Sequence, residues 1–239
     1  MSHTIQDITL LNLGIGFIPM LIVLGFLFKW HMNYGNAIYA IVRMVIQLLI
    51  IGYLLVFIFN TKSSWVVMGI LLVMVVASSW IALGVVKKDQ VNLLLNALIA
   101  ISIGGSITLL VVTQGVLSLD PWYEPRYVIP LAGMIFANSM NTVSLAVERM
   151  QSETGRGVSY LDARNIAFQA SLIPVINSLF AVGLVSLPGM MTGQILSGVS
   201  PLVAVRYQIA VMCMIFSSAG ISSALFLILA KRYFTTRED

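Results

Sequence analysis

Long stretches without a charged residue divide this chain into about seven apolar segments. A helix needs about 20 mostly apolar residues to cross a bilayer, and each segment approaches or exceeds that length. The loops are short, so we expect a single all-α, polytopic transmembrane domain over residues 1–239. The expected spans are Leu10–Phe28, Ile38–Phe59, Ser64–Val86, Leu93–Val116, Tyr127–Val147, Ile166–Val185 and Tyr207–Ala230.

Composition leads to the same class of protein. Only 9% of the 239 residues are charged and the mean hydropathy is +0.98, whereas soluble domains carry about 25% charged residues. The net charge of +4 comes from basic residues near span ends, where lipid head groups and the positive-inside rule account for them. We therefore expect an integral membrane protein that does not bind nucleic acid. The single cysteine, Cys213, excludes a disulfide framework.

Lys and Arg counts predict the orientation. Cytoplasmic segments of membrane proteins carry an excess of these residues. With the N-terminus outside, nine fall inside and three outside, while Arg43 lies about one turn inside the second span and snorkels inward. We therefore expect an outer N-terminus and a cytoplasmic C-terminus. The inner residues are Lys29, Lys87, Lys88, Arg149, Arg156, Arg164, Lys231, Arg232 and Arg237, and the outer ones are Lys62, Arg126 and Arg206.

One span has a polar stripe. Met134, Asn138 and Asn141 share a face of the expected helix Tyr127–Val147. Asparagine is costly toward lipid, so this face points at other helices or at a watery path. Two interpretations stay open: hydrogen bonds to neighbouring helices, and the lining of a substrate path.

The segment before the last span is apolar but interrupted by glycine and proline. As a full span it would place the basic C-terminal tail outside, so we expect a re-entrant or half-helix element. Its small residues recur every four positions and predict either close helix packing or a gate. Met190 and Met191 lie on the same glycine-flanked backbone and are further candidates for the substrate path. The small residues are Gly189, Gly193 and Ser197.

The longest charged inner segment runs from Glu148 to Arg164. Its Glu-Arg start and its glycine break predict a short helix lying across the membrane surface. A permease driven by another protein needs a cytoplasmic contact, and this segment is the only inner one with enough polar length. The candidate coupling residues are Glu148, Arg149, Gly157 and Asp162.

Several catalytic and energy-converting motifs are missing. The sequence holds no GxxxxGK[ST] phosphate loop, HExxH, CxxC or GxSxG, so we expect no enzyme activity and no ATP bound by that route. No Asp or Glu lies inside a span, which argues against a proton-driven carrier because such carriers use buried carboxylates. Most of the thirteen methionines are interpreted as gap-filling apolar residues, and the metal ligands are not predicted.

Specific strings of the sequence resemble a known family. They are AIVRMVIQLLIIGYLL (residues 40–55), IPLAGMIFANSM (129–140) and SLIPVINSLFAVGLVSLPGMMTGQILSGVSPLVAVRYQ (171–208). At these strings the chain is similar to permease subunits of bacterial iron-export ATP-binding-cassette transporters and to plant aluminium-tolerance permeases. The resemblance covers almost the whole chain. The family's cytoplasmic segment is longer, and here only GVSYLDA (157–163) resembles its docking stretch.

The resemblance implies a permease in the bacterial cytoplasmic membrane that exports iron or another metal ion. It also implies a homodimer of permeases with separate cytoplasmic ATPase subunits, which bind ATP and Mg, while this chain needs no cofactor. The alternatives are a cassette permease for a nucleotide sugar or another small solute, a stand-alone carrier, and a membrane scaffold subunit without transport.

Overall fold

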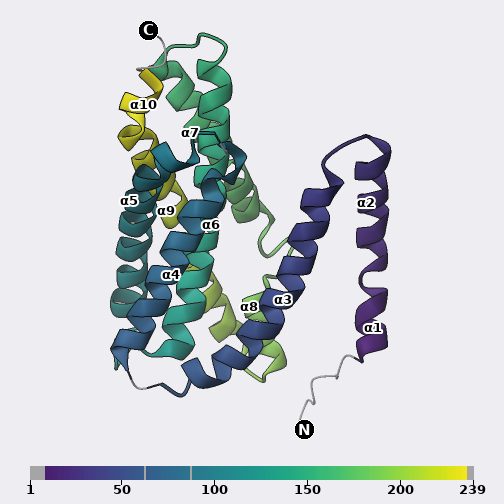
Figure 1. The fold of residues 1–239 in the computed structure, drawn as a ribbon. Helices are drawn as coiled ribbons and strands as arrows, with labels where there is room; N and C mark the ends of the chain where they lie inside the picture. Colours follow the sequence, from purple (N-terminus) through teal and green to yellow (C-terminus); the bar gives the residue numbers. More distant parts are fainter. Residues whose placement is uncertain (1–8, 62, 87, 236–239) are drawn as a thin grey trace. The chain divides into compact units, whose positions relative to one another are not determined.

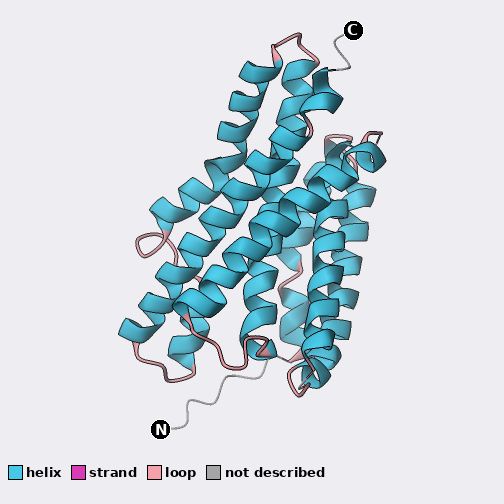
Figure 2. Ribbon diagram, turned by 90° about the vertical axis from the view of Figure 1, so that its left-hand side faces the viewer, coloured by secondary structure: helices cyan, strands magenta, loops and turns pink. Residues whose placement is uncertain are grey.

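Every regular element in the described residues, 9–61, 63–86 and 88–235 of a computed structural model, is a helix (Figure 1, Figure 2). The predicted all-α class is confirmed. Two of the elements are not α-helical: η1 is a 3₁₀ helix and η2 is a π helix. In chain order the elements are α1 (Leu10–Ile15), α2 (Ile18–Lys29), α3 (Tyr34–Ile58), α4 (Ser64–Ala82), η1 (Leu83–Val86), α5 (Gln90–Leu110), η2 (Val111–Val116), α6 (Pro125–Thr154), α7 (Tyr160–Ala181), α8 (Gly189–Leu196), α9 (Pro201–Leu229) and α10 (Lys231–Thr235).

Six helical segments of the described chain are long and apolar enough to cross a membrane. They are Leu11–Lys29, Tyr34–Ile58, Ser64–Val86, Gln90–Val116, Pro125–Thr154 and Pro201–Leu229. The sixth of the seven expected spans, Ile166–Val185, corresponds to α7, which starts earlier and ends at Ala181. α7 is not among the six, because its first half carries Asp162, Arg164, Asn165 and Gln169.

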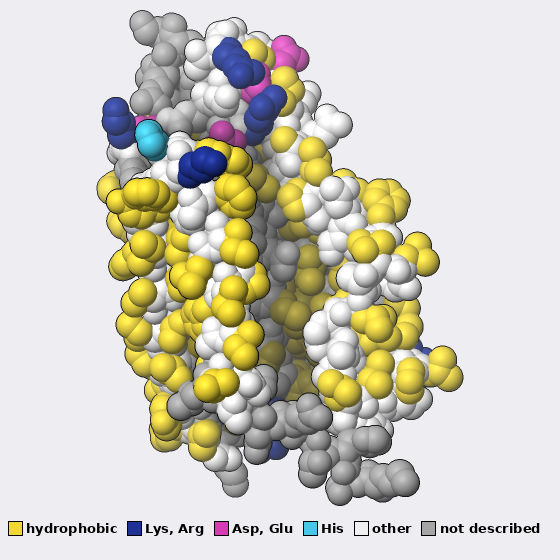
Figure 3. All heavy atoms as spheres, turned by 90° about the vertical axis from the view of Figure 1, so that its right-hand side faces the viewer, with side chains coloured by type: hydrophobic (Ala, Val, Ile, Leu, Met, Phe, Trp, Pro, Cys, Tyr) yellow, Lys and Arg dark blue, Asp and Glu magenta, His cyan; other side chains and the backbone are white. Residues whose placement is uncertain are grey.

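The first of two compact units comprises residues 1–61, of which α1, α2 and α3 are described. The expected first span is broken between α1 and α2, just before Pro19, which lies in the first turn of α2. Proline is tolerated there because its missing N–H has no helical partner at that position. No described residue of α2 is buried, and Ile58 is the one buried residue of α3. Hydrophobic side chains cover this hairpin along its flank (Figure 3), as expected for helices in contact with lipid.

The second unit comprises residues 62–239 and is a helical bundle. α5, α6 and α9 pack on one another, α4 covers α5 and α6, and α7 packs on α6 and α9. Side chains from α4, α5, α6 and α9 fill the interior. The fully buried ones include Val67, Leu93, Ile101, Ile135, Val143, Met150, Met214 and Phe226. The expectation of one domain over residues 1–239 stays a prediction.

Helix α5 approaches α6 and α9 closely at two neighbouring glycines, Gly104 and Gly105. A Cβ atom on Gly104 would lie 3.0 Å from the backbone nitrogen of Ser222, and one on Gly105 would lie 2.5 Å from a ring carbon of Phe136. Beside them, the Ser139 hydroxyl donates to the Ser218 carbonyl at 3.2 Å and accepts from the Ser222 hydroxyl at 3.1 Å. Lipid tails are as apolar as the helix surfaces, so the hydrophobic effect does not favour contact between membrane helices. Close packing at small residues and hydrogen bonds between hydroxyl groups hold such helices together instead.

The expected surface helix over 148–164 is wrong. α6 continues straight to Thr154, and a short turn leads directly into α7 at Tyr160. Glu153 explains the extension, since its buried carboxylate pairs with Arg149 at 2.8 Å and Arg156 at 3.5 Å. These ion pairs compensate the charge of the last helical turn, so α6 need not end at the charged residues.

The predicted half-helix is confirmed as α8. Its eight residues span about 12 Å, which is too short to cross a bilayer. Pro188 precedes α8, and Gly198 follows it with a φ of +91° that favours glycine. α8 packs against α9.

Candidate functional site

A pocket of about 130 Å³ lies between α6, α7 and α9 in the second unit. It contains both asparagines of the predicted polar stripe. No charged side chain lines it, and five of its nine residues carry an amide or a hydroxyl group. The lining residues are Asn138, Asn141, Thr142, Leu145, Ser171, Pro174, Val175, Ser178 and Ile215.

The two asparagines do not bond to neighbouring helices. The Asn138 amide nitrogen donates to the Met134 carbonyl of its own helix at 2.8 Å, which leaves the side-chain oxygen as an acceptor at the pocket. Asn141 is exposed and makes no side-chain hydrogen bond within residues 9–61, 63–86 and 88–235. Interhelical hydrogen bonding is therefore not what these residues do in the described chain. The substrate-path interpretation of the stripe stays a prediction.

α7 supplies oxygen atoms from the opposite wall. The Ser171 hydroxyl donates to the Phe168 carbonyl at 2.8 Å, and Ser178 is exposed on the pocket. The pocket thus offers neutral amide and hydroxyl oxygens, the ligand type that suits hard cations and water.

No tight metal cage is present in the part of the chain that the structure describes. No group of three or more His, Cys, Asp or Glu side chains lies together there. The methionines are not assembled at the pocket either: Met134, whose carbonyl accepts from the Asn138 amide, is not among its lining residues, and neither are Met190 and Met191 on α8. The structure therefore brings together Asn138 and Asn141 but leaves the predicted thioethers apart.

The glycine face of α8 makes no close contact within the described chain. A Cβ atom on Gly189 or Gly193 would meet nothing within 4 Å, and the Ser197 hydroxyl bonds to the Gly193 carbonyl of its own helix at 2.8 Å. Packing by this face stays a prediction. The small residues that do pack, Gly104 and Ser222, were missed although ISIGGS (101–106) and SSAGISS (217–223) already showed small residues one turn apart.

The predicted coupling residues lie around the α6–α7 turn. Glu148 is exposed, and Arg149 is engaged with the buried Glu153. Gly157 has a φ of +79°, a conformation that L side chains rarely adopt. Asp162 caps α7 with Ser159: the Asp162 N–H donates to the Ser159 hydroxyl at 3.3 Å, and that hydroxyl donates to the carboxylate at 2.7 Å.

Further contacts tie this turn to the rest of the bundle end. The Tyr160 hydroxyl donates to the Leu227 carbonyl of α9 at 2.7 Å, and burial raises the pKa of this phenol although Arg164 nearby opposes the rise. Gln151 of α6 donates to the Asp89 carboxylate at 2.8 Å. The α6–α7 turn, the α4–α5 connection and α10 therefore form one braced end of the unit (Figure 1).

The family described as "Uncharacterised protein family (UPF0014)" matches residues 9–164 and 157–234. The chain belongs to this family. The two matched pieces meet at the α6–α7 turn.

Three relatives are each 33% identical to the chain over most of its length. The chain is 33% identical to "UPF0014 membrane protein slr1647" of Synechocystis, over 86% of this chain and 85% of that protein. It is also 33% identical to "Probable iron export permease protein FetB" of Escherichia coli, over 83% and 81%. The same identity, over 79% and 73%, relates it to "Protein ALUMINUM SENSITIVE 3" of Arabidopsis thaliana. No solved structure matches the chain.

Proposed function

We propose that this chain is the permease subunit of a metal-ion exporter driven by a separate ATPase, assembled as two permeases and two ATPases in the bacterial cytoplasmic membrane. The observation that carries the proposal is the uncharged, oxygen-lined pocket between α6, α7 and α9, inside a bundle of membrane-spanning helices. The family membership and the iron-export name of the Escherichia coli relative support it.

The pocket is the substrate path in this proposal. Neutral amide and hydroxyl oxygens replace part of the hydration shell of a cation. They bind the cation weakly, because none of these ligands carries a negative formal charge. Weak binding suits an exporter, which has to release its cargo on the far side. A cation that keeps several of its waters fits a pocket of about 130 Å³.

The ATPase docks at the braced end of the second unit in this proposal. The exposed α6–α7 turn, α10 and a hollow of about 310 Å³ lined by Gly84–Val86, Lys88 and Gln151 lie there. Since the sequence has no phosphate loop, ATP and Mg²⁺ are bound by the partner. Rigid contacts such as Tyr160 with Leu227 carry the motion of the docked partner to α7 and α9, two walls of the pocket.

Co-purification from the native host tests the proposal. The isolated complex, reconstituted in vesicles, is assayed for ATP hydrolysis and for flux with a panel of divalent cations, among them Fe²⁺ and Mn²⁺, and with a nucleotide sugar. We expect metal-stimulated hydrolysis and metal flux that both require the partner. Stimulation by the sugar alone, flux without any partner, or no flux under any condition would each contradict the proposal and favour an organic-solute permease, a stand-alone carrier or a scaffold.

The Gly157→Leu variant is expected to uncouple ATP hydrolysis from transport while the protein still inserts. Gly157 needs a positive φ, so leucine distorts the α6–α7 turn that meets the ATPase. Gly157→Asn is the matched control, because asparagine tolerates this conformation and should keep transport coupled. Glu148→Ala, which removes an exposed charge beside the turn, is expected to weaken coupling too. Cross-linking that finds the ATPase docked on α10 (Lys231–Thr235) without any contact to the α6–α7 turn would refute this assignment.

Single-cysteine labelling checks the orientation of the same end. In a Cys213→Ala background, Arg156→Cys and Ser200→Cys place thiols at two exposed positions. Position 156 lies in the turn whose Tyr160 contacts Leu227 near the end of α9, and position 200 lies just before the start of α9. The positive-inside count predicts that an impermeant maleimide labels intact cells at position 200 and labels position 156 only after lysis. The reverse pattern would invert the topology.

A further inference from the structure

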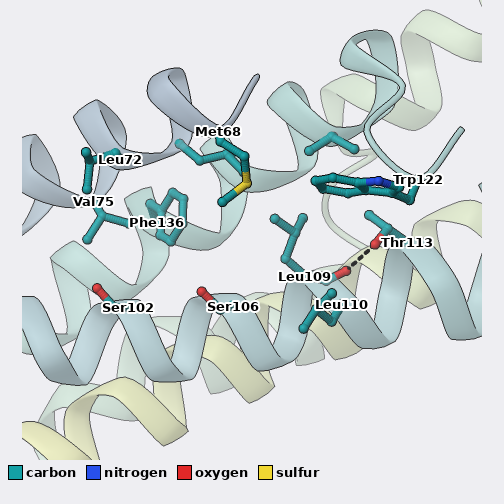
Figure 4. Close-up of a pocket in the computed structure, with 12 residues that line it drawn as sticks. Met68, Leu72, Val75, Ser102, Ser106, Leu109, Leu110, Thr113, Trp122 and Phe136 are labelled. Atoms are coloured by element: carbon teal, nitrogen blue, oxygen red, sulfur yellow. Dashed lines mark hydrogen bonds between the residues drawn. The ribbon is translucent and has the colours of Figure 1, made fainter. Parts of the chain in front are cut away.

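A second, larger cavity lies between α4, α5 and α6, apart from the polar pocket. Its volume is about 400 Å³, and an apolar cavity of about 150 Å³ already stays dry and binds benzene. Its walls are almost entirely apolar, with Met68 and Leu72 from α4 and Phe136 from α6 (Figure 4). Two serines of α5, Ser102 and Ser106, form its floor. Their small side chains leave the space that larger apolar residues would fill.

The cavity runs along the helices. It extends on α5 from Ser102 to Thr113 in η2, eleven residues or about 16 Å at the rise of a helix. Half of a bilayer's hydrocarbon core, which is about 30 Å thick, is about 15 Å. Ser102 lies near the middle of the Gln90–Val116 span, and Trp122 lines the cavity beyond the end of that span. The cavity therefore reaches from the bilayer midplane to one interface, where tryptophan side chains prefer to lie.

The surface around the opening is apolar. Leu72 is 65% exposed and Leu110 is 58% exposed, and both line the cavity. These residues belong to spans whose outward side chains contact lipid, so hydrocarbon and not water is the medium at the opening. The Thr113 hydroxyl does not provide a polar anchor, because it donates to the Leu109 carbonyl at 2.8 Å (Figure 4).

We propose that this cavity is a binding site for one acyl chain of a phospholipid from the leaflet at the Trp122 end. The length of the cavity matches one leaflet, its walls match a hydrocarbon chain, and its opening is continuous with the lipid-facing surface. Trp122 lies where the chain joins the glycerol and head group. The site is separate from the polar pocket, since the two share no lining residue.

Electron paramagnetic resonance on the full chain tests the site. The purified protein, washed free of lipid in mild detergent, is mixed with phosphatidylethanolamine spin-labelled near the end of one acyl chain. We expect one immobilised lipid per chain when the labelled lipid is added to saturation. Ser106→Trp fills the cavity and should abolish this component. Ile107→Trp, at the next position and 50% exposed but outside the cavity lining, should retain it.

Alkylation gives a second measurement that needs no bulky residue. In a Cys213→Ala background, the thiol introduced by Ser106→Cys should react with N-ethylmaleimide in washed protein and be protected when phosphatidylethanolamine is added back. The proposal is overturned if wild type holds no immobilised lipid, if both tryptophan variants behave alike, or if added lipid does not protect the thiol. Protection that needs no added lipid and grows with protein concentration also overturns it, because a second copy would then fill the cavity.

Discussion

Replacing Asn138 and Asn141 together by leucine is expected to abolish metal export by the reconstituted complex. Leucine fills a similar volume but offers no acceptor, so the pocket between α6, α7 and α9 loses both of its amide groups. Folding should be retained, because the only side-chain hydrogen bond lost in the described chain is the local one from Asn138 to Met134. Metal flux and ATPase activity in vesicles measure the effect.

Asn96→Leu is the matched control for this double variant. Asn96 is a half-buried residue of α5 and does not line the pocket, so its replacement removes an asparagine at a similar burial elsewhere. Export should remain close to wild type in the control, and the partner ATPase should still co-purify with both variants. Normal export by the double variant would show that the asparagines only occupy space and that the substrate passes elsewhere.

Replacing Gly104 by leucine is expected to cause the largest loss of stability. The new side chain meets the backbone of α9 at Ser222, which cannot move aside as a flexible side chain would. Overpacking of this kind costs about 1–3 kcal/mol and sometimes more. It also separates the helices whose serines at 139 and 222 are hydrogen-bonded. The midpoint of thermal unfolding in detergent, followed by size-exclusion chromatography, measures the effect.

Gly69→Leu controls for the general effect of replacing a glycine inside a helix. A Cβ atom on Gly69 of α4 meets nothing within 4 Å, so this variant should unfold near the wild-type midpoint. Gly193→Leu should behave in the same way for the isolated chain. A loss of transport by Gly193→Leu without a loss of stability would support packing of that face against a second permease. Equal midpoints for Gly104→Leu and Gly69→Leu would disprove the close approach of α5 and α9.

The sequence alone predicted most of the fold. Apolar runs of sufficient length identify membrane helices because the bilayer forces each backbone polar group to be satisfied within its own helix. Glycine and proline around α8 likewise predicted a half-helix. The surface helix over 148–164 was predicted wrongly. Charge patterning shows where a helix leaves the bilayer, but it does not show that Arg149 and Arg156 pair with Glu153 and allow α6 to continue.

The candidate site was predicted in part. The helical period placed Asn138 and Asn141 on one face, and both line one pocket. Ser171 and Ser178 on α7 could not be assigned to that pocket from their own helix, since the period of one helix does not specify which face of another it meets. The same limit explains why Met190 and Met191 on α8 could not be related to this pocket in advance; they do not line it, and their part in a substrate path stays a prediction.

The sequence by itself determined that this chain is an all-helical membrane protein with a polar stripe in one long span. Local length, hydropathy and the helical period are sufficient for those features. Only the tertiary structure decided which small residues let helices touch, because Gly104 and Gly193 look alike in the sequence but only Gly104 faces another backbone. It also decided that the larger cavity exists, since empty space depends on how side chains from α4, α5 and α6 meet and not on any one of them.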